Sequence, residues 1–483
     1  MRVLMAASEA APLAKTGGLA DVLGALPGAL KSAGVEVAIV LPAYRAVDRE
    51  RFHVRAAGWS VAVPVSDRLV NAEILTTEIA GGVPVYLVQA DSYFDRDGLY
   101  GTPEGDFLDN AERFAFFARA VLAVAERVGP PDILHCHDWQ TALAPAFLKV
   151  DAGRYPSLRN TRTLLTIHNL AYQGLYWSAD WHLLNLDRQY YNPAQFEFYG
   201  KINYLKAGIV FADEVTTVSR KYAEEIQTPE FGFGLEGVLQ SRRAALTGIL
   251  NGADGEHWSP AHDPHIAARY DADDLAGKAV CKADLQKTSG LPLEPRQPVI
   301  GMVSRLADQK GFDLVAEALP ALLRRKLQVV LLGQGDAKYQ TLITDLGRRF
   351  TRRLGVRIGF DDPLAHKIEA GADLFLMPSR FEPCGLNEIY SLRYGTIPVV
   401  RATGGLDDTI VDFDPETGTG TGFKFRDYTP AALLGCIKRA LACYRRPAQW
   451  RQLMRNAMDA EFSWQSSAQG YLAVYRRLTG SSQ

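Results

Sequence analysis

The chain has 483 residues, of which 47% are hydrophobic, and a formal net charge of -2 at pH 7. This length can bury extensive cores and predicts two domains, whereas the balanced charge gives no electrostatic footprint for nucleic acid or an anionic membrane, and no apolar run approaches the length of a membrane span. Five cysteines without metal-ligand spacing indicate reduced thiols, and a strand directly after Met1 and Arg2 leaves no room for a signal peptide, so we expect a cytoplasmic protein.

Short apolar runs alternate with helix-length amphipathic stretches in the first half of the chain. Strands are expected at 3–7, 35–41, 83–88, 132–137, 163–168, 214–218 and 247–250, and helices at 21–31, 110–127 and 139–149. Such alternation predicts a mostly parallel sheet that is covered on both faces.

The same pattern restarts after a polar segment rich in Pro and Asp, residues 259–274. Strands are then expected at 299–303, 328–332, 356–359, 374–377 and 397–400, followed by a last helix at 463–478. The sequence therefore predicts an α/β protein with two doubly wound, Rossmann-like domains that face a cleft. Ligands of such sheets bind beyond the carboxyl ends of the strands, so the functional motifs should follow strands.

The first such motif is the sequence Lys-Thr-Gly-Gly-Leu at 15–19, between a strand and a helix. Gly17 and Gly18 let the backbone turn sharply and bring N–H groups close to an anion, while the helix N-terminus and Lys15 add positive charge. This arrangement favours a phosphate site. An ordinary glycine turn of an α/β domain remains the alternative.

Two cations follow the first strand of the second domain. Arg305 stands at the strand end and Lys310 near the start of the next helix. The guanidinium can bind phosphate oxygens with two hydrogen bonds, and the ammonium adds a compact charge nearby. We favour a phosphate site here over two solvated surface cations.

A third motif spans 378–388, after the expected strand at 374–377. Gly385 and Leu386 can present N–H groups to an anion, and Glu382 can accept hydrogen bonds from sugar hydroxyls. Cys384 is interpreted as a bystander because no base is visibly paired with it. The run Thr403, Gly404 and Gly405 repeats the order of strand and glycines, with a structural turn as an equal alternative.

In the first domain, His135, Cys136, His137 and Asp138 look like a metal cluster. Strand alternation, however, places the two histidines on one face and Cys136 on the other, so we prefer a substrate-facing Asp138 supported by core histidines. His168 closes the next strand in a similar way and is as much a structural as a ligand-binding candidate.

Together these motifs resemble bacterial glycogen synthase and plant starch synthase, with their order and spacing intact from Arg2 to the tail helix. The resemblance implies a GT-B fold and a retaining transfer of glucose from ADP-glucose to the non-reducing 4-hydroxyl of an α-1,4-glucan. It divides the chain into an acceptor-side domain at 1–250, a donor-side domain at 251–462, and a terminal helix at 463–483 that packs back on the first domain.

The resemblance also implies roles for single residues. Lys15, Gly17 and Gly18 would lie at the diphosphate and donor sugar, and Arg305 and Lys310 on the phosphates. Glu382 would bind the sugar hydroxyls. The residues beside the leaving group would be Cys384, Gly385 and Leu386. The transferred glucose would be surrounded by Asp138, His168 and Asn251. Asn387 and Glu388 depart from the family, in which Thr-Gln is frequent, and Phe360 replaces a frequent Tyr.

Several questions stay open at this point. Retention could use a covalent carboxylate intermediate or attack on the face that the phosphate leaves, and we lean to the latter. A UDP-glucose transferase, a dehydrogenase suggested by the glycines at 333 and 335, and a glucan-binding protein are alternatives. Asp95 and Asp97 form an Asp-x-Asp pair typical of metal-dependent transferases, but we interpret the pair as part of a solvated loop and expect neither a metal nor a cofactor.

Overall fold

The computed structural model describes residues 1–102, 104–253, 255 and 257–480. The chain divides into two compact units, the first made of Met1–Gly252 with the segment from Trp464 onward, and the second of Ala253–Ser463. Among the described helices, none combines the length and apolar character that a membrane span requires.

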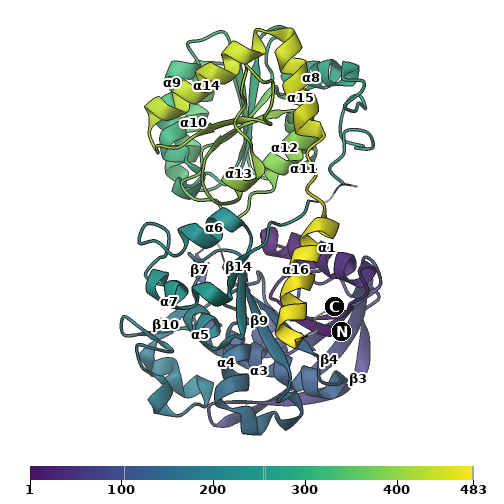
Figure 1. Ribbon diagram of the computed structural model, residues 1–483, viewed down its shortest axis with the longest axis vertical. Helices are drawn as coiled ribbons and strands as arrows, with labels where there is room; N and C mark the ends of the chain where they lie inside the picture. Colours follow the sequence, from purple (N-terminus) through teal and green to yellow (C-terminus); the bar gives the residue numbers. More distant parts are fainter. Residues whose placement is uncertain (103, 254, 256, 481–483) are drawn as a thin grey trace. The chain divides into compact units, whose positions relative to one another are not determined.

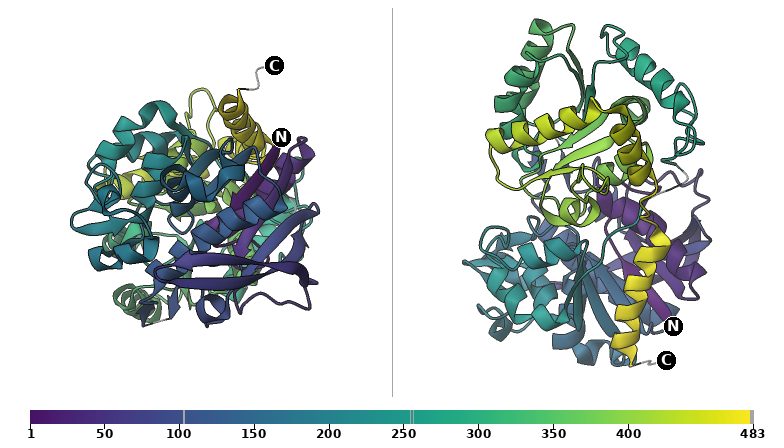
Figure 2. Two further views of the ribbon diagram at one scale, coloured as in Figure 1. Left: turned by 90° about the horizontal axis from the view of Figure 1, so that it is seen from below. Right: turned by 45° about the horizontal axis from the view of Figure 1, so that its top comes forward.

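The first unit is built around a nine-stranded sheet in the order β14-β13-β9-β8-β1-β2-β5-β4-β3 (Figure 1). The strands from β14 to β5 pair in parallel, whereas β4 pairs antiparallel with both β5 and β3. Their bounds are β1 Arg2–Ala6, β2 Glu36–Pro42, β3 Arg55–Val65, β4 Arg68–Ile79, β5 Val83–Gln89, β8 Ile133–His137, β9 Arg162–Ile167, β13 Glu214–Thr217 and β14 Leu246–Gly248. The left view of Figure 2 shows the long β3–β4 hairpin in dark blue.

Helices cover the parallel part of this sheet because its central strands are apolar on both faces. The helices of this unit are α1 Gly18–Ser32, α2 Asp91–Phe94, α3 Asn110–Val128, α4 Leu143–Val150, α5 Tyr204–Phe211, α6 Arg220–Glu225, α7 Glu236–Ser241 and α16 Trp464–Thr479. Short strands outside the sheet are β6 Gly101–Thr102, β7 Gly105–Asp106, β10 Leu175–Trp177, β11 Glu197–Phe198 and β12 Lys201–Asn203. Short 3₁₀ helices span 152–154, 156–158, 178–184, 188–190 and 243–245.

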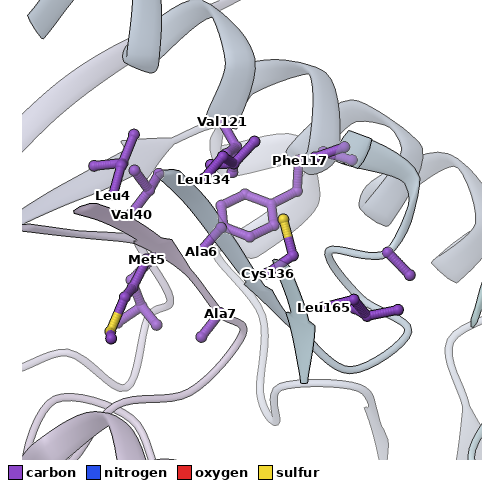
Figure 3. Close-up of a cluster of buried hydrophobic side chains, with 14 of the residues drawn as sticks. Leu4, Met5, Ala6, Ala7, Val40, Phe117, Val121, Leu134, Cys136 and Leu165 are labelled. Atoms are coloured by element: carbon purple, nitrogen blue, oxygen red, sulfur yellow. The ribbon is translucent and has the colours of Figure 1, made fainter. Parts of the chain in front are cut away.

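The core of the first unit shows the alternation expected of a buried strand. Leu4 and Ala6 of β1 face Phe117 and Val121 of α3, whereas Met5 points to the opposite face (Figure 3). All five side chains are almost fully buried. A strand with apolar residues on both faces can only sit in the middle of a covered sheet, which places β1 there.

The terminal helix α16 belongs to the first unit, where it packs against α1 and β8 (Figure 1). It buries Trp464, Tyr471, Val474 and Tyr475 along one face. Tyr471 comes seven positions after Trp464, and Val474 and Tyr475 come three and four positions after Tyr471, so these residues form a single apolar stripe on the helix.

The second unit contains a six-stranded, wholly parallel sheet in the order β17-β16-β15-β18-β19-β20. The bounds are β15 Val299–Val303, β16 Gln328–Gly333, β17 Leu354–Ile358, β18 Leu374–Met377, β19 Ile397–Arg401 and β20 Phe423–Phe425. The helices are α8 Ala276–Thr288, α9 Phe312–Leu322, α10 Ala337–Arg349, α11 Asp362–Gly371, α12 Asn387–Arg393, α13 Gly404–Thr409, α14 Pro430–Tyr444 and α15 Pro447–Met458 (Figures 1 and 2), with a 3₁₀ turn at Asp308–Lys310.

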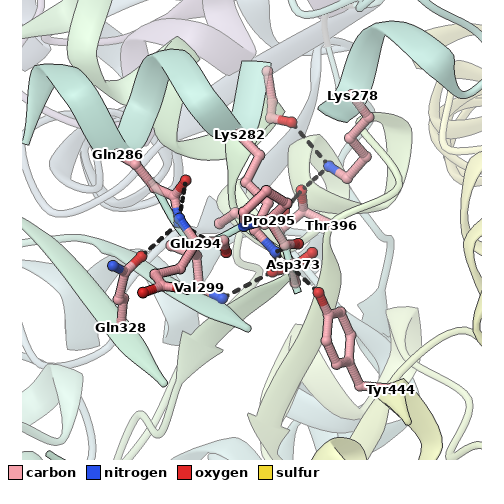
Figure 4. Close-up of polar contacts among 12 residues, drawn as sticks. Lys278, Lys282, Gln286, Glu294, Pro295, Val299, Gln328, Asp373, Thr396 and Tyr444 are labelled. Atoms are coloured by element: carbon pink, nitrogen blue, oxygen red, sulfur yellow. Dashed lines mark hydrogen bonds and ion pairs between the residues drawn. The ribbon is translucent and has the colours of Figure 1, made fainter. Parts of the chain in front are cut away.

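A buried polar network fixes α8 to this sheet (Figure 4). Lys282 Nζ lies 2.7 Å from Asp373 Oδ2, which also accepts a hydrogen bond from the backbone N–H of Val299 at 2.8 Å. One turn earlier, Lys278 donates to the Thr396 hydroxyl at 2.6 Å. Each buried ammonium group thus has partners, which offsets much of its desolvation cost.

The predicted fold class, two doubly wound α/β domains with a terminal helix on the first, is confirmed, and each predicted strand is present. Some boundaries differ. The helix expected at 21–31 begins at Gly18, and the one expected at 139–149 begins at Leu143. The β3–β4 hairpin and β20 were not predicted.

Candidate active site

The second unit carries three predicted motifs on neighbouring strands. Arg305 and Lys310 follow β15, the motif at 378–388 follows β18, and the run 403–405 follows β19. Strand β15 lies between β16 and β18, so the chain order reverses between β15 and β18. This is the switch point at which open parallel sheets bind ligands beyond their carboxyl ends.

Lys310 and Glu382 are brought together directly. Lys310 Nζ lies 2.6 Å from Glu382 Oε2, and the Ser379 hydroxyl donates to the same oxygen at 3.0 Å. The Glu382 side chain is 8% exposed and the Lys310 side chain 20% exposed. Such a partly dehydrated pair is fixed in position, so its ammonium group can meet an anion without first being ordered.

Arg305 is in a different state. Its side chain is exposed and donates to the neutral Gln309 amide oxygen at 3.0 Å. Within the described part of the chain, no carboxylate is ion-paired with it. Its positive charge is therefore available to a phosphate group.

Two glycine loops touch each other behind these side chains. Gly385 has φ +84 and Gly404 φ +46, a region in which glycine is favoured. A Cβ atom at Gly404 would overlap the Glu382 carbonyl oxygen, and one at Gly405 would overlap the Cys384 carbonyl oxygen. Gly405 N–H also donates to the Glu382 carbonyl at 3.1 Å. Close packing thus explains why glycine occupies these positions, and a ligand role for the run 403–405 stays a prediction.

Glu388, which departs from the family pattern, lies beneath the Gly385 loop. It is fully buried, and its Oε1 accepts a hydrogen bond from the Thr409 hydroxyl at 3.3 Å. Burial, reinforced by the nearby Glu382 carboxylate, raises the pKa of Glu388 to about 8. The Glu388 carboxyl is therefore mostly neutral at pH 7. The one signal in the sequence was an acid beside apolar residues at the start of a helix.

In the first unit, the loop of Lys15 differs from its prediction. The amides of Thr16 and Gly17 donate to the buried carboxylate of Glu9, at 2.5 and 3.1 Å. Lys15 Nζ pairs with Asp21 Oδ1 at 2.6 Å. Donors expected to face an anionic ligand are thus used by the chain's own carboxylates, so a ligand would have to replace them. In the sequence, only the location of Glu9 shortly after β1 could have identified it as a candidate site residue.

The same loop has an open side. Gly17 and Gly18 are exposed, and a Cβ atom at either would meet nothing within 4 Å. Helix α1 begins at Gly18, with Gly17 as its N-cap. The helix start therefore faces open space, as an approach to an anion requires.

Asp138 directly follows β8 in a left-handed conformation, with φ +56. Its Oδ1 accepts a hydrogen bond from the backbone N–H of His168 at 2.7 Å. Burial raises the pKa of Asp138 to about 7, although backbone N–H groups of His168 and Asn169 act in the opposite direction. The two predicted residues Asp138 and His168 therefore form one unit at adjacent strand ends.

The histidines of this region form a hydrogen-bonded series. His137 Nδ1 lies 2.9 Å from His168 Nε2, and His135 Nδ1 lies 2.8 Å from the Tyr475 hydroxyl on α16. Burial lowers the pKa of His135 and of His168 to about 3, so both rings are neutral at physiological pH. Cys136 points to the other face of β8, into the apolar core, as the alternation predicts (Figure 3).

Two further sequence predictions can be placed. Asn251 is buried, and its amide oxygen has no hydrogen-bond partner among the described residues. Asp95 and Asp97 both pair with Arg45, at 2.8 and 3.0 Å, and are exposed. Both carboxylates of the Asp-x-Asp pair are thus ion-paired with one cation of their own unit.

Comparison with known proteins gives matches along the whole chain. The starch synthase catalytic domain family matches residues 2–241, and the family of glycosyl transferases group 1 matches residues 286–457. A glycogen synthase of Koribacter versatilis is 50% identical over 99% of this chain and 98% of its own, and one of Anaeromyxobacter dehalogenans is 51% identical over 99% of both. The chain belongs to the glycogen synthase family.

The structural comparisons agree with this family assignment. The catalytic domain of starch synthase IV from Arabidopsis thaliana, solved with ADP and acarbose, is similar with a TM-score of 0.90 and 35% identity, covering 99% of both chains. Sucrose-phosphate synthase from Thermosynechococcus elongatus has a TM-score of 0.60 at 19% identity over 100% of both chains, which shows a shared fold alone. The GT-B fold expected of a glycogen synthase family member is thereby confirmed.

Proposed function

We propose that the chain transfers glucose from ADP-glucose, with retention, to the non-reducing 4-hydroxyl of an α-1,4-glucan such as glycogen, and releases ADP. The observation that carries this proposal is the full-length identity of 47 to 51% with glycogen synthases. The similarity to a starch synthase solved with ADP and acarbose supports a nucleotide sugar as donor and a glucan as acceptor.

In the second unit, we assign Arg305 and Lys310 to the diphosphate. Negative charge grows on the leaving ADP as the glycosidic bond breaks, and cations that bind it more tightly at that stage lower the barrier. The ion pair with Glu382 supports this assignment because it holds Lys310 in one place before the donor arrives. Amides at Cys384, Gly385 and Leu386 would add hydrogen bonds to the same charge.

Glu382 has a second role in this proposal, as an acceptor for hydroxyls of the transferred glucose. One of its oxygens holds Lys310 and Ser379. A carboxylate has about four acceptor sites, so the other oxygen can still accept from a sugar hydroxyl. The run Thr403, Gly404 and Gly405 would support this carboxylate through its backbone contacts with residues 382 and 384.

In the first unit, we assign Asp138, His168 and Asn251 to the transferred glucose, and Lys15, Gly17 and Gly18 to the donor diphosphate. The buried, unpaired amide oxygen of Asn251 supports its assignment, since a sugar hydroxyl could donate to it. The neutral imidazole of His168, held by His137, would contribute a hydrogen bond without charge.

Retention is assigned to attack on the face that ADP leaves, with a phosphate oxygen accepting the proton of the acceptor hydroxyl. Asp138 supports this choice, because a carboxyl with a pKa of about 7 is about half protonated at pH 7 and only its deprotonated form can attack, while its Oδ1 already accepts a backbone hydrogen bond. The assignment predicts that no glucosyl-enzyme accumulates in a rapid-quench experiment. A covalent adduct on Asp138 would overturn it.

A donor assay tests the proposed function. The purified protein, glycogen and radiolabelled ADP-glucose should give labelled glucan and stoichiometric ADP, and UDP-glucose should be a poorer donor. Higher kcat/KM with UDP-glucose would make the chain a UDP-glucose transferase. Glucan binding without transfer from either donor would make it a binding protein.

We also propose a cytoplasmic location, supported by five cysteines without disulfides.

A further inference from the structure

A second group of ligand-type side chains lies in the second unit, outside the residues assigned above. One ligand atom from each of His257, Asp362 and His366 lies within 4.8 Å of the other two. Asp362 and His366 are four residues apart on α11, so they share one face of that helix. His257 comes from the segment that opens the unit, more than a hundred residues earlier in the chain.

His366 is oriented by a buried carboxylate. Its Nδ1 lies 2.7 Å from Asp263 Oδ2, and both side chains are fully buried. A neutral imidazole that donates from Nδ1 carries a lone pair on Nε2, and a carboxylate behind the ring makes that lone pair more basic. Asp263 is itself fixed by the backbone N–H of His265 at 2.8 Å and by the Tyr394 hydroxyl.

The lone pair of His366 Nε2 has no hydrogen-bond partner among the described residues, although the atom is buried. The nearby Asp362 Oδ2 is 4.0 Å away, which is too far for a hydrogen bond. A buried polar atom without a partner costs about 1–3 kcal/mol, so such atoms usually have a ligand or a role.

The ring of His366 is also held in its plane. Trp258 stacks on it with ring centroids 3.7 Å apart and an angle of 5°. Tyr390 stacks on Trp258 with centroids 4.4 Å apart. The direction of Nε2 is thus fixed by packing as well as by Asp263, as in a pre-organised ligand.

We propose that His257, Asp362 and His366 bind one divalent transition-metal ion of the zinc type, with Asp263 as the positioning residue. Two imidazoles and one carboxylate favour zinc over magnesium or calcium, which prefer sets of oxygen ligands. His257 is exposed and the Asp362 side chain is 44% exposed, so an ion can reach the cluster from solvent. The ion would tie the segment that opens the second unit to α11.

Zinc titration of the full-length protein tests the proposal. The protein is prepared without an affinity tag, treated with a chelator that is then removed, and titrated with Zn²⁺ against a chromophoric competitor. One equivalent should bind, and saturating Zn²⁺ should raise the melting temperature. Co²⁺ in place of Zn²⁺ should give visible absorption bands of a four-coordinate site, which a non-specific surface ion would not give.

Variants locate the binding site. His257→Gln and Asp362→Asn change residues near the surface, so folding should survive, and each should weaken Zn²⁺ binding about 10-fold or more. His262→Gln is the matched control, because His262 is exposed in the same segment but outside the cluster. Unchanged affinity in His257→Gln, an equal loss in His262→Gln, or the absence of stoichiometric binding by the unaltered protein would overturn the proposal.

Discussion

The buried acid Glu388 gives a prediction about how stability depends on pH. Burial and the neighbouring Glu382 carboxylate raise the pKa of Glu388 from 4.5 to about 8 in the folded protein. Between these values the folded chain keeps a proton that the unfolded chain has lost. Folding therefore becomes less favourable as the pH rises, by about 1.4 kcal/mol for each pH unit.

The size of the effect follows from the same two values. At pH 7 the penalty on folding is about 3 kcal/mol, and it is complete above the folded pKa of about 8. Glu388→Gln removes the titrating group and keeps the shape of the side chain, so the penalty disappears. The amide carries a burial cost of its own, but that cost does not change with pH.

Thermal unfolding from pH 5 to pH 8 measures this difference. For a domain of this size 1 kcal/mol shifts the melting temperature by about 2–4 °C. The pH-dependent penalty grows by about 3.5 kcal/mol from pH 5 to pH 8, so the melting temperature of Glu388→Gln relative to the unaltered protein should rise by about 10 °C over this range. Glu317→Gln is the control, because Glu317 is exposed on α9. Melting curves of Glu388→Gln and the unaltered protein that shift in parallel with pH would refute the reasoning.

Three further predictions concern the proposed reaction and its supports. Arg305→Ala and Lys310→Ala should each lower kcat roughly 30- to 1000-fold, the equivalent of about 2–4 kcal/mol at the leaving phosphate; near-normal turnover in steady-state assays would remove that role. Gly385→Ala should raise the KM for the donor and lower the melting temperature, since φ is +84 and the added Cβ atom would overlap the Glu388 carboxylate; unaltered values would contradict this packing argument. Tyr475→Phe removes the hydroxyl partner of buried His135 and should cost about 1–2 kcal/mol in urea unfolding, a loss that would be absent if the bond were unimportant.

The amino-acid sequence by itself determined the fold class and the places of the motifs. Apolar runs such as 299–303 are continuous because the strands of a covered parallel sheet are buried on both faces, and this signal is local. The carboxyl end of such a strand is equally local, so Arg305 and Glu382 could be assigned to strand ends from the sequence. Strand β3 escaped prediction because it is a half-exposed edge strand, interrupted by Gly58 and Pro64.

Tertiary structure alone decided which of these residues meet. Lys310 and Glu382 are 72 positions apart, and His135 and Tyr475 are 340 apart. No local propensity encodes such pairs, because they form only when the sheet order and the return of α16 bring distant segments together. The same holds for Glu9, which takes the amides of the Lys15 loop, and for the three side chains proposed as a metal site. The side-chain types of these residues can be read from the sequence, but the distances between the side chains depend on how the elements pack.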